Sequence, residues 1–151
     1  MKKYLPWILV AVGVVIDQIT KLFALNIEKS IEVIPGILNF TLVMNEGAAF
    51  GIAQGSGYIL LGISVVICLV VLGSIIFLKS KEEKVSPGFY LVLSGGIGNI
   101  IDRLFRGYVV DFIDTPFIAT FNVADSLIVI GVIWLIIEET IVSVFSKKST
   151  E

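Results

Sequence analysis

Histidine is absent from the 151 residues, and cysteine occurs once, as Cys68. Without histidine the chain cannot assemble a Ser-His-Asp or Cys-His nucleophile, a His-ligated zinc site or an HExxH motif. Cys68 lies between Ile67 and Leu69 in an apolar run, where a thiolate is disfavoured, and it has no partner for an internal disulfide. We interpret it as an inert packing residue. Any catalysis must therefore use carboxylates, Lys, Arg, Ser, Thr, Tyr or Asn.

Charged residues are also scarce. They make up 16% of the chain, against about 25% in a typical soluble domain. Hydrophobic residues make up 56%, and the mean hydropathy is +0.99. These values predict an integral membrane protein, and the length predicts a single domain over residues 1–151. The net charge of −2 and the lack of a basic, aromatic-rich tract give no indication of a nucleic-acid partner.

Long apolar runs predict four transmembrane helices, at about residues 5–25, 58–78, 85–103 and 121–145. Such runs can cross a hydrocarbon core of about 30 Å at a rise of about 1.5 Å per residue. The first run follows Lys2 and Lys3 and could be mistaken for a cleavable signal peptide. It carries Asp17 and Lys21, however, and it lacks a clear cleavage site of small residues and is followed by further spans. We therefore predict a retained first helix.

The segment between the first two runs has a different pattern. Residues 31–34, a Pro35-Gly36 turn and the alternating residues 40–45 predict strands, whereas residues 47–51 favour neither strand nor helix. Because unpaired strands are not tolerated in lipid, we predict a small β-rich cradle outside the bilayer core. The expected fold is thus an all-α membrane protein with a β element between helices 1 and 2.

Basic residues predict the orientation of the four spans. Those that fall on one side are Lys2, Lys3, Lys79, Lys81, Lys84, Lys147 and Lys148. The positive-inside rule assigns this side, with both termini, to the cytoplasm. The cradle and a loop containing Asp111 would then lie at the outer face. Four polar residues would also lie near the outer ends of their helices, namely Asp17, Lys21, Arg103 and Asp125. Separate segments would thus place polar groups at the same depth in the membrane.

Two groups of residues on the first and third predicted helices leave alternatives open. Asp17 and Lys21 are four residues apart and share a helix face, which fits either a structural ion pair or a role in positioning a site. Gly95, Asn99 and Arg103 form one stripe of the third helix. Close helix packing explains the glycine. It does not explain Asn99 and Arg103.

The start of the fourth run carries the strongest catalytic candidates. Asn122 and Asp125 share a helix face, where an aspartate also suits the helix dipole as a cap. Asp111 lies in the segment that connects the third and fourth runs, so it must lie at the same rim of the membrane as Asp125. Asp114 is a rival, but it precedes a Thr115-Pro116 turn and is interpreted as a solvated loop residue.

Asp111 and Asp125 are hypothesised to form one catalytic pair. Two close carboxyl groups cannot both ionise easily, so they share a proton. The ionised member deprotonates a water, while the protonated member polarises a carbonyl and later protonates the leaving amine. This predicts peptide hydrolysis without a covalent intermediate, and the proton belongs to the pair rather than to either member. Asp102, beside Arg103, is interpreted as a local partner rather than a catalyst.

Five motifs in order along the chain resemble the lipoprotein signal peptidase (signal peptidase II) family. They are DQITK (residues 17–21), NEGAAF (45–50), GNIIDR (98–103), GYVVDF (107–112) and FNVAD (121–125). One departure is Ser94-Gly95-Gly96, where the family often has Gly-Gly-Ala. It exchanges small residues for small residues, so helix packing is little affected.

The resemblance implies a bacterial aspartic endopeptidase of the cytoplasmic membrane. Such enzymes remove signal peptides from prolipoproteins by cutting before a cysteine that bears a diacylglyceryl group. The motif match implies Asp111 and Asp125 as the catalytic dyad. It implies substrate-binding or supporting roles for Asn45, Gly47, Asn99, Arg103, Asn122, Ala124, Asp17, Lys21 and Asp102. We expect no cofactor or metal, with lipid-modified signal peptides and membrane lipids as partners of a monomer.

Two other classes of protein are alternatives to the peptidase. A small proton- or ion-coupled transporter also carries intramembrane Asp and Lys, but its carboxylates should lie near the bilayer midplane, whereas these lie near the outer end. A non-enzymatic membrane scaffold would have no use for a polar cluster at the rim. The sequence therefore favours the peptidase.

Overall fold

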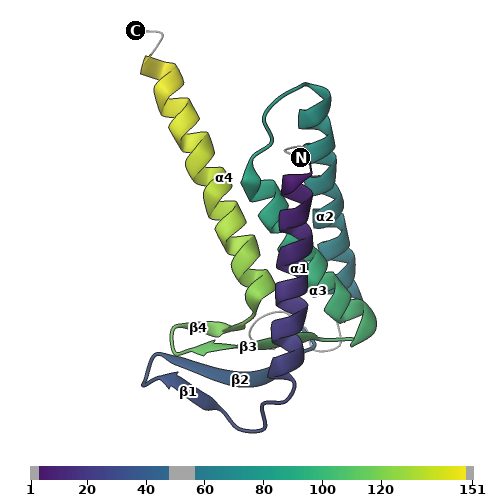
Figure 1. Cartoon of the computed structure of the whole chain (residues 1–151), viewed down its shortest axis with the longest axis vertical. Helices are drawn as coiled ribbons and strands as arrows, with labels where there is room; N and C mark the ends of the chain where they lie inside the picture. The colour runs from purple at the N-terminus through teal and green to yellow at the C-terminus, as the bar shows by residue number, and fades with distance from the viewer. Residues whose placement is uncertain (1–3, 48–56, 149–151) are drawn as a thin grey trace.

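Four helices lie side by side, and a four-stranded antiparallel sheet lies across one end of them in the computed structural model (Figure 1). The structure describes residues 4–47 and 57–148, with the backbone alone for residues 142–148. The helices are α1 (Leu5–Ala24), α2 (Gly57–Ser80), α3 (Pro87–Phe105) and α4 (Val123–Lys148). They coincide closely with the four predicted runs. Lys2, Lys3 and most of the segment 47–51 lie outside the described residues.

The sheet combines two segments that are far apart in the sequence. Its strands, in spatial order, are β1 (Ile31–Ile34), β2 (Leu38–Asn45), β3 (Val109–Thr115) and β4 (Ile118–Phe121). The prediction that the cradle comes only from the segment between the first two helices is wrong, as is the prediction of a loop around Asp111. Gly107, at φ +80°, forms the turn that leads from α3 into β3. β3 is an inner strand, and its first residues are buried beneath the ends of the helices.

Asp114 is a sheet residue and not the solvated loop residue that its neighbours predicted. It lies in β3 and is half-buried. Its carboxylate accepts hydrogen bonds from the hydroxyl groups of Thr41 (3.4 Å) and Thr120 (3.3 Å). These contacts connect β3 to both neighbouring strands, so the Asp114 carboxylate is used within the sheet.

α3 is the central helix and contacts each of the other three. Its small residues allow the close approach of α4. A Cβ added to Gly95 would lie 2.2 Å from the carbonyl oxygen of Ala124, and one added to Gly88 would lie 2.7 Å from the carbonyl oxygen of Gly131. The predicted packing role of Gly95 is therefore confirmed, because no side chain fits between the two backbones.

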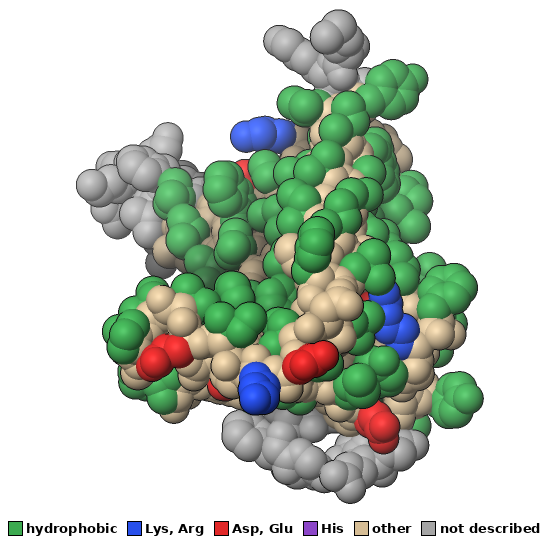
Figure 2. All heavy atoms as spheres, turned by 60° about the horizontal axis from the view of Figure 1, so that its bottom comes forward, with side chains coloured by type: hydrophobic (Ala, Val, Ile, Leu, Met, Phe, Trp, Pro, Cys, Tyr) green, Lys and Arg blue, Asp and Glu red, His purple; other side chains and the backbone are tan. Residues whose placement is uncertain are grey.

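Hydrophobic side chains cover the outside of the helices (Figure 2). Examples are Phe23 on α1, 73% exposed, and Leu69 on α2, 61% exposed. Water would disfavour an apolar surface of this extent, whereas lipid would not. By length and composition, α1 and α2 are able to cross a membrane.

Candidate active site

Asp111 on β3 and Asp125 in the first turn of α4 meet where the sheet joins the helices. Asn122 contacts both carboxylates. Its Nδ2 donates to Asp111 Oδ1 at 2.7 Å, and its backbone N–H donates to Asp125 Oδ2 at 3.3 Å. The predicted pair therefore lies at one site, although its members come from a strand and a helix.

A capping box fixes Asp125 at the start of α4. The backbone N–H of Asp125 donates to Asn122 Oδ1 at 2.9 Å, in return for the bond from the Asn122 backbone to Asp125 Oδ2. The capping role considered for Asp125 is therefore present. It uses one carboxylate oxygen, and the other, Oδ1, accepts a hydrogen bond from Asn99 Nδ2 at 2.8 Å.

Asn45 approaches Asp111 from the neighbouring strand. Its Nδ2 donates to Asp111 Oδ2 at 2.9 Å. The backbone N–H of Gly47 donates to Asn45 Oδ1 at 3.1 Å, which holds the amide with its NH₂ group toward the carboxylate. Each oxygen of Asp111 thus receives an amide N–H bond, one from Asn45 and one from Asn122.

The surroundings of Asp111 change its acidity. The side chain is only 2% exposed, and burial raises the pKa of Asp111 to about 6. This value of about 6 already includes the hydrogen bond from Asn45, which lowers the pKa, and the negative charge of Asp125, which raises it. A carboxyl group with this pKa can gain and lose a proton near neutral pH, as acid–base catalysis requires.

Lys21 on α1 connects a buried ion-pair network to this site. Its ammonium group lies 2.9 Å from Asp17 Oδ2 and 3.0 Å from Asp102 Oδ2, and it donates to Asn99 Oδ1 at 3.0 Å. Lys can only donate, so the oxygen of Asn99 faces Lys21 and its NH₂ group faces Asp125. The predicted Asp17–Lys21 pair is present, and it orients a residue of the site.

Asp102 is a partner in this network, as predicted, but adjacent Arg103 is not the residue it pairs with. Its carboxylate forms ion pairs with Lys21 and with Arg106, one helical turn later. It also accepts a hydrogen bond from the backbone N–H of Val110 at 3.0 Å. Asp102 therefore attaches the start of β3 to α3.

Asp17 has the equivalent function for α4. Its Oδ1 accepts a hydrogen bond from the backbone N–H of Ala124 at 2.8 Å. Gln18, which sequence reasoning did not single out, donates to Asp17 (3.1 Å) and to Asp102 (3.2 Å) and accepts from Arg106 (3.1 Å). An amide beside an aspartate within an apolar run was the available signal for Gln18.

Arg103 lies near the pair but does not contact it. Its guanidinium is within hydrogen-bonding distance of Ser64 Oγ, at 3.4 Å, and it interacts electrostatically with Asp125 and Asp111. Within residues 4–47 and 57–148, it forms no ion pair. It contributes to the wall of a cavity of about 280 Å³. The wall residues are Glu46, Gly57, Tyr58, Leu61, Arg103, Leu104 and Gly107.

The part of the chain that the structure describes holds no group of three or more His, Cys, Asp or Glu side chains able to bind a metal ion.

The fold is similar to two solved structures, each described as a bacterial membrane enzyme. One has a TM-score of 0.77 at 32% identity, covering 97% of this chain and 90% of that chain. The other has a TM-score of 0.74 at 34% identity, covering 88% and 90%. The fold is therefore that of a bacterial membrane enzyme.

Residues 9–141 match the family model described as signal peptidase (SPase) II. The lipoprotein signal peptidase of Caldicellulosiruptor bescii is 38% identical over 147 residues, which cover 94% of this chain and 97% of that protein. The lipoprotein signal peptidase of Staphylococcus haemolyticus is 41% identical over 150 residues, with 90% and 92% covered. The chain belongs to the lipoprotein signal peptidase (signal peptidase II) family, as its motifs predicted. This membership decides against a transporter or a scaffold.

Proposed function

We propose that the chain removes the signal peptide from lipid-modified bacterial prolipoproteins by cutting before the lipidated cysteine, with Asp111 and Asp125 as the catalytic pair. Family membership supplies the class of activity, and the names of the relatives supply the class of substrate. One observation carries the assignment of the pair: Asn122 hydrogen-bonds to both carboxylates where β3 meets α4.

In the proposed reaction the pair holds one proton. The ionised carboxylate takes a proton from a water, whose oxygen attacks the scissile carbonyl carbon. The protonated carboxyl donates a hydrogen bond to the carbonyl oxygen, and a proton then passes to the leaving amine as the C–N bond breaks. The raised pKa of Asp111, about 6, supports a pair that can hold and release a shared proton just below neutral pH.

Supporting roles follow from the contacts of the pair. Asn45, Asn99 and Asn122 orient the carboxylates through their N–H groups. Lys21 sets the orientation of Asn99. Arg103, on the wall of the adjacent cavity, is assigned to binding the substrate backbone.

We further propose that all four helices span the membrane, with the sheet at the outer face and both chain ends in the cytoplasm. The end of the helices opposite the sheet carries Lys79, Lys81 and Lys84 on and after the last turn of α2 (Figure 1), which suits the cytoplasmic side. A lipid on the cysteine would keep the scissile bond near the outer leaflet. Anchoring of this kind raises the local concentration of the bond beside the pair and limits its orientations.

The test is cleavage of a synthetic precursor by the purified protein, followed by mass spectrometry. The precursor is prepared with and without a diacylglyceryl group on its cysteine. We expect a single cut directly before the cysteine, in the lipidated precursor only, and no loss of rate on adding a chelator. A cut at another bond, or equal cleavage of the unlipidated precursor, would contradict the proposal.

A further inference from the structure

One face of α4 carries an apolar stripe between two carboxylates. Glu139 follows Asp125 by 14 residues (139 minus 125), and at about 100° per residue it points within about 40° of the same direction. Val129, Val132 and Ile136 lie on this face and are 56%, 42% and 60% exposed. The stripe therefore begins at the proposed catalytic pair and ends at an acidic side chain.

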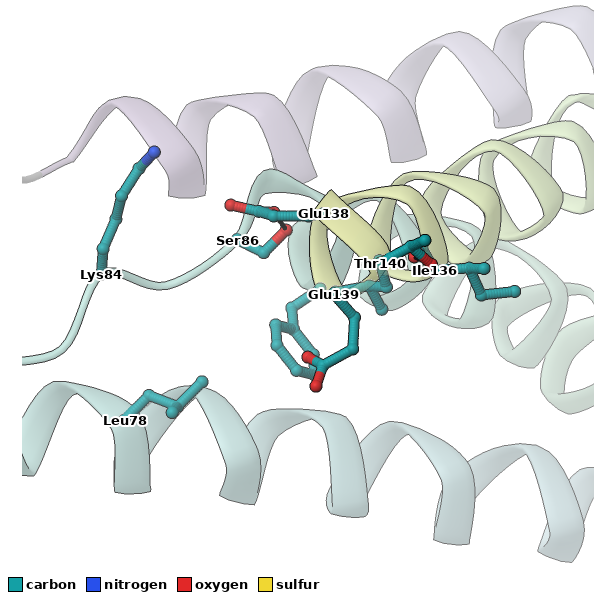
Figure 3. A pocket seen from close by; sticks show the side chains of 9 residues that line it. Leu78, Lys84, Ser86, Ile136, Glu138, Glu139 and Thr140 are labelled. Atoms are coloured by element: carbon teal, nitrogen blue, oxygen red, sulfur yellow. Dashed lines mark hydrogen bonds between the residues drawn. The ribbon is translucent and has the colours of Figure 1, made fainter. Parts of the chain in front are cut away.

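A cavity of about 600 Å³ lies at the end of the helices opposite the sheet and is lined by residues of α2, α3, α4 and the segment that precedes α3 (Figure 3). Glu138 accepts a hydrogen bond from Ser86, which caps α3. Glu139 points away from Ser86 and toward Leu78 on α2 (Figure 3). Among the described residues, Glu139 forms no ion pair, not even with Lys84, which also lines this cavity.

The length of the stripe matches the length of a signal peptide. Fourteen helical residues at about 1.5 Å each separate Asp125 from Glu139 by about 21 Å. A signal peptide has a basic n-region followed by an apolar segment of about 7–15 residues, which spans about 10–22 Å as a helix. If its scissile end lies at Asp125, its basic n-region reaches the level of Glu139.

We propose that Glu139 binds the basic n-region of the signal peptide while the apolar segment lies along the stripe of α4. The inference rests on the proposed function and adds a second contact, remote from the cleavage site, that selects the substrate by charge and length. This end of the protein also carries Lys79, Lys81 and Lys84, which repel a basic segment. The Glu139 carboxylate offsets this repulsion at the point where the n-region arrives.

The test compares kcat/KM in a neutral detergent for three lipidated precursors, which carry two lysines, two glutamines or two glutamates in the n-region. We expect the wild type to prefer the lysine precursor about threefold to fivefold, as for an ion pair at an exposed surface. Glu139→Gln should remove this preference, and Glu139→Lys should prefer a precursor with two n-region glutamates. The matched control is Glu83→Gln, which removes an exposed carboxylate from the α2–α3 connection and should keep the wild-type preference.

A second experiment tests the length of the apolar segment of the signal peptide. Inserting four apolar residues moves the lysines about 6 Å farther from the cleavage site, and Glu139→Gln should then have a smaller effect. A wild type without preference, or a preference unchanged in Glu139→Gln, would overturn the inference while cleavage itself still supported the proposed function. No cleavage of the lysine precursor by the wild type would contradict the proposed function and this inference with it.

Discussion

At the scale of single residues, three asparagines surround the carboxylates. Asn45 and Asn122 donate to the two oxygens of Asp111, and Asn99 donates to Asp125. Hydrogen bonds to an ionised carboxylate favour the ionised form, whereas burial favours the neutral form. For Asp111 burial outweighs the hydrogen bonds, and the pKa lies at about 6.

Asn45→Ala tests this balance. The lost hydrogen bond had favoured the ionised carboxylate, so its removal should raise the pKa of Asp111 above about 6. The pair then keeps its proton to higher pH, and the alkaline limb of the kcat/KM profile should move upward in pH. The same pH profile is measured for the control variant Asn39→Ala. Asn39 lies on the same strand as Asn45 but pairs with Asp114. A limb that stays in place or moves to lower pH would disprove this explanation.

Lys21→Met tests the ion-pair network. The substitution leaves the carboxylates of Asp17 and Asp102 buried without this cation. Removing one member of a buried ion pair costs about 3–5 kcal/mol, so the melting temperature in detergent should fall markedly. Lys29→Met, which removes an exposed lysine, should leave it nearly unchanged. Equal melting temperatures for the two variants would show that the network contributes little.

The residue types alone predicted the pair but not the geometry around it. Asp111 and Asp125 could be singled out because the chain offers few other catalytic groups. The contact of Asn45 with Asp111 could not be foreseen, because it depends on the β2–β3 register, in which Val43 faces Asp111 and an irregularity occurs before it. Sequence spacing does not report such a register.

At the scale of elements, the crossing of α3 and α4 positions the site. Gly95→Ala should displace the first turn of α4, because the new Cβ would meet the carbonyl oxygen of Ala124. We expect a loss of at least about 1–3 kcal/mol of stability together with a fall in kcat, since Asp125 follows Ala124. Melting temperature and kcat are measured for both this variant and a control.

The control is Gly73→Ala in α2. Apart from its own helix backbone and chain neighbours, no atom of the described residues lies within 4 Å of its added Cβ. Alanine is also the better helix former by about 0.5–1 kcal/mol. This variant should be as stable as the wild type or more so. A harmless Gly95→Ala would show that α4 can move without effect on the site.

The four helices could be predicted because each is a long apolar run. The strand β3 was missed for a physical reason: its apolar residues are interrupted by Asp111 and Asp114, which usually indicates a loop. The sheet tolerates both acids, since amides surround Asp111 and threonine hydroxyls contact Asp114. Pairing between β2 and β3 joins segments separated by two whole helices, and no local pattern specifies it.

At the scale of the whole molecule, the two ends of the helices differ in character. The sheet and the candidate site occupy one end, and the α2–α3 connection with its lysines occupies the other (Figure 1). Cysteine labelling of intact cells with an impermeant reagent tests their orientation. In a Cys68→Ala background, we expect labelling of Lys29→Cys near the sheet and none of Lys81→Cys after α2. The reverse result would invert the proposed topology.

The most direct test of the central proposal is the kcat of Asp111→Asn, Asp125→Asn and Asp114→Asn on a lipidated precursor. Loss of an acid–base group costs about a hundredfold to ten-thousandfold in rate, so the first two variants should lose at least this much. Asp114→Asn alters the same strand without touching the pair and should stay near the wild-type rate. Melting temperatures establish that each variant is folded. A folded Asp111→Asn or Asp125→Asn enzyme with wild-type kcat would contradict the catalytic pair.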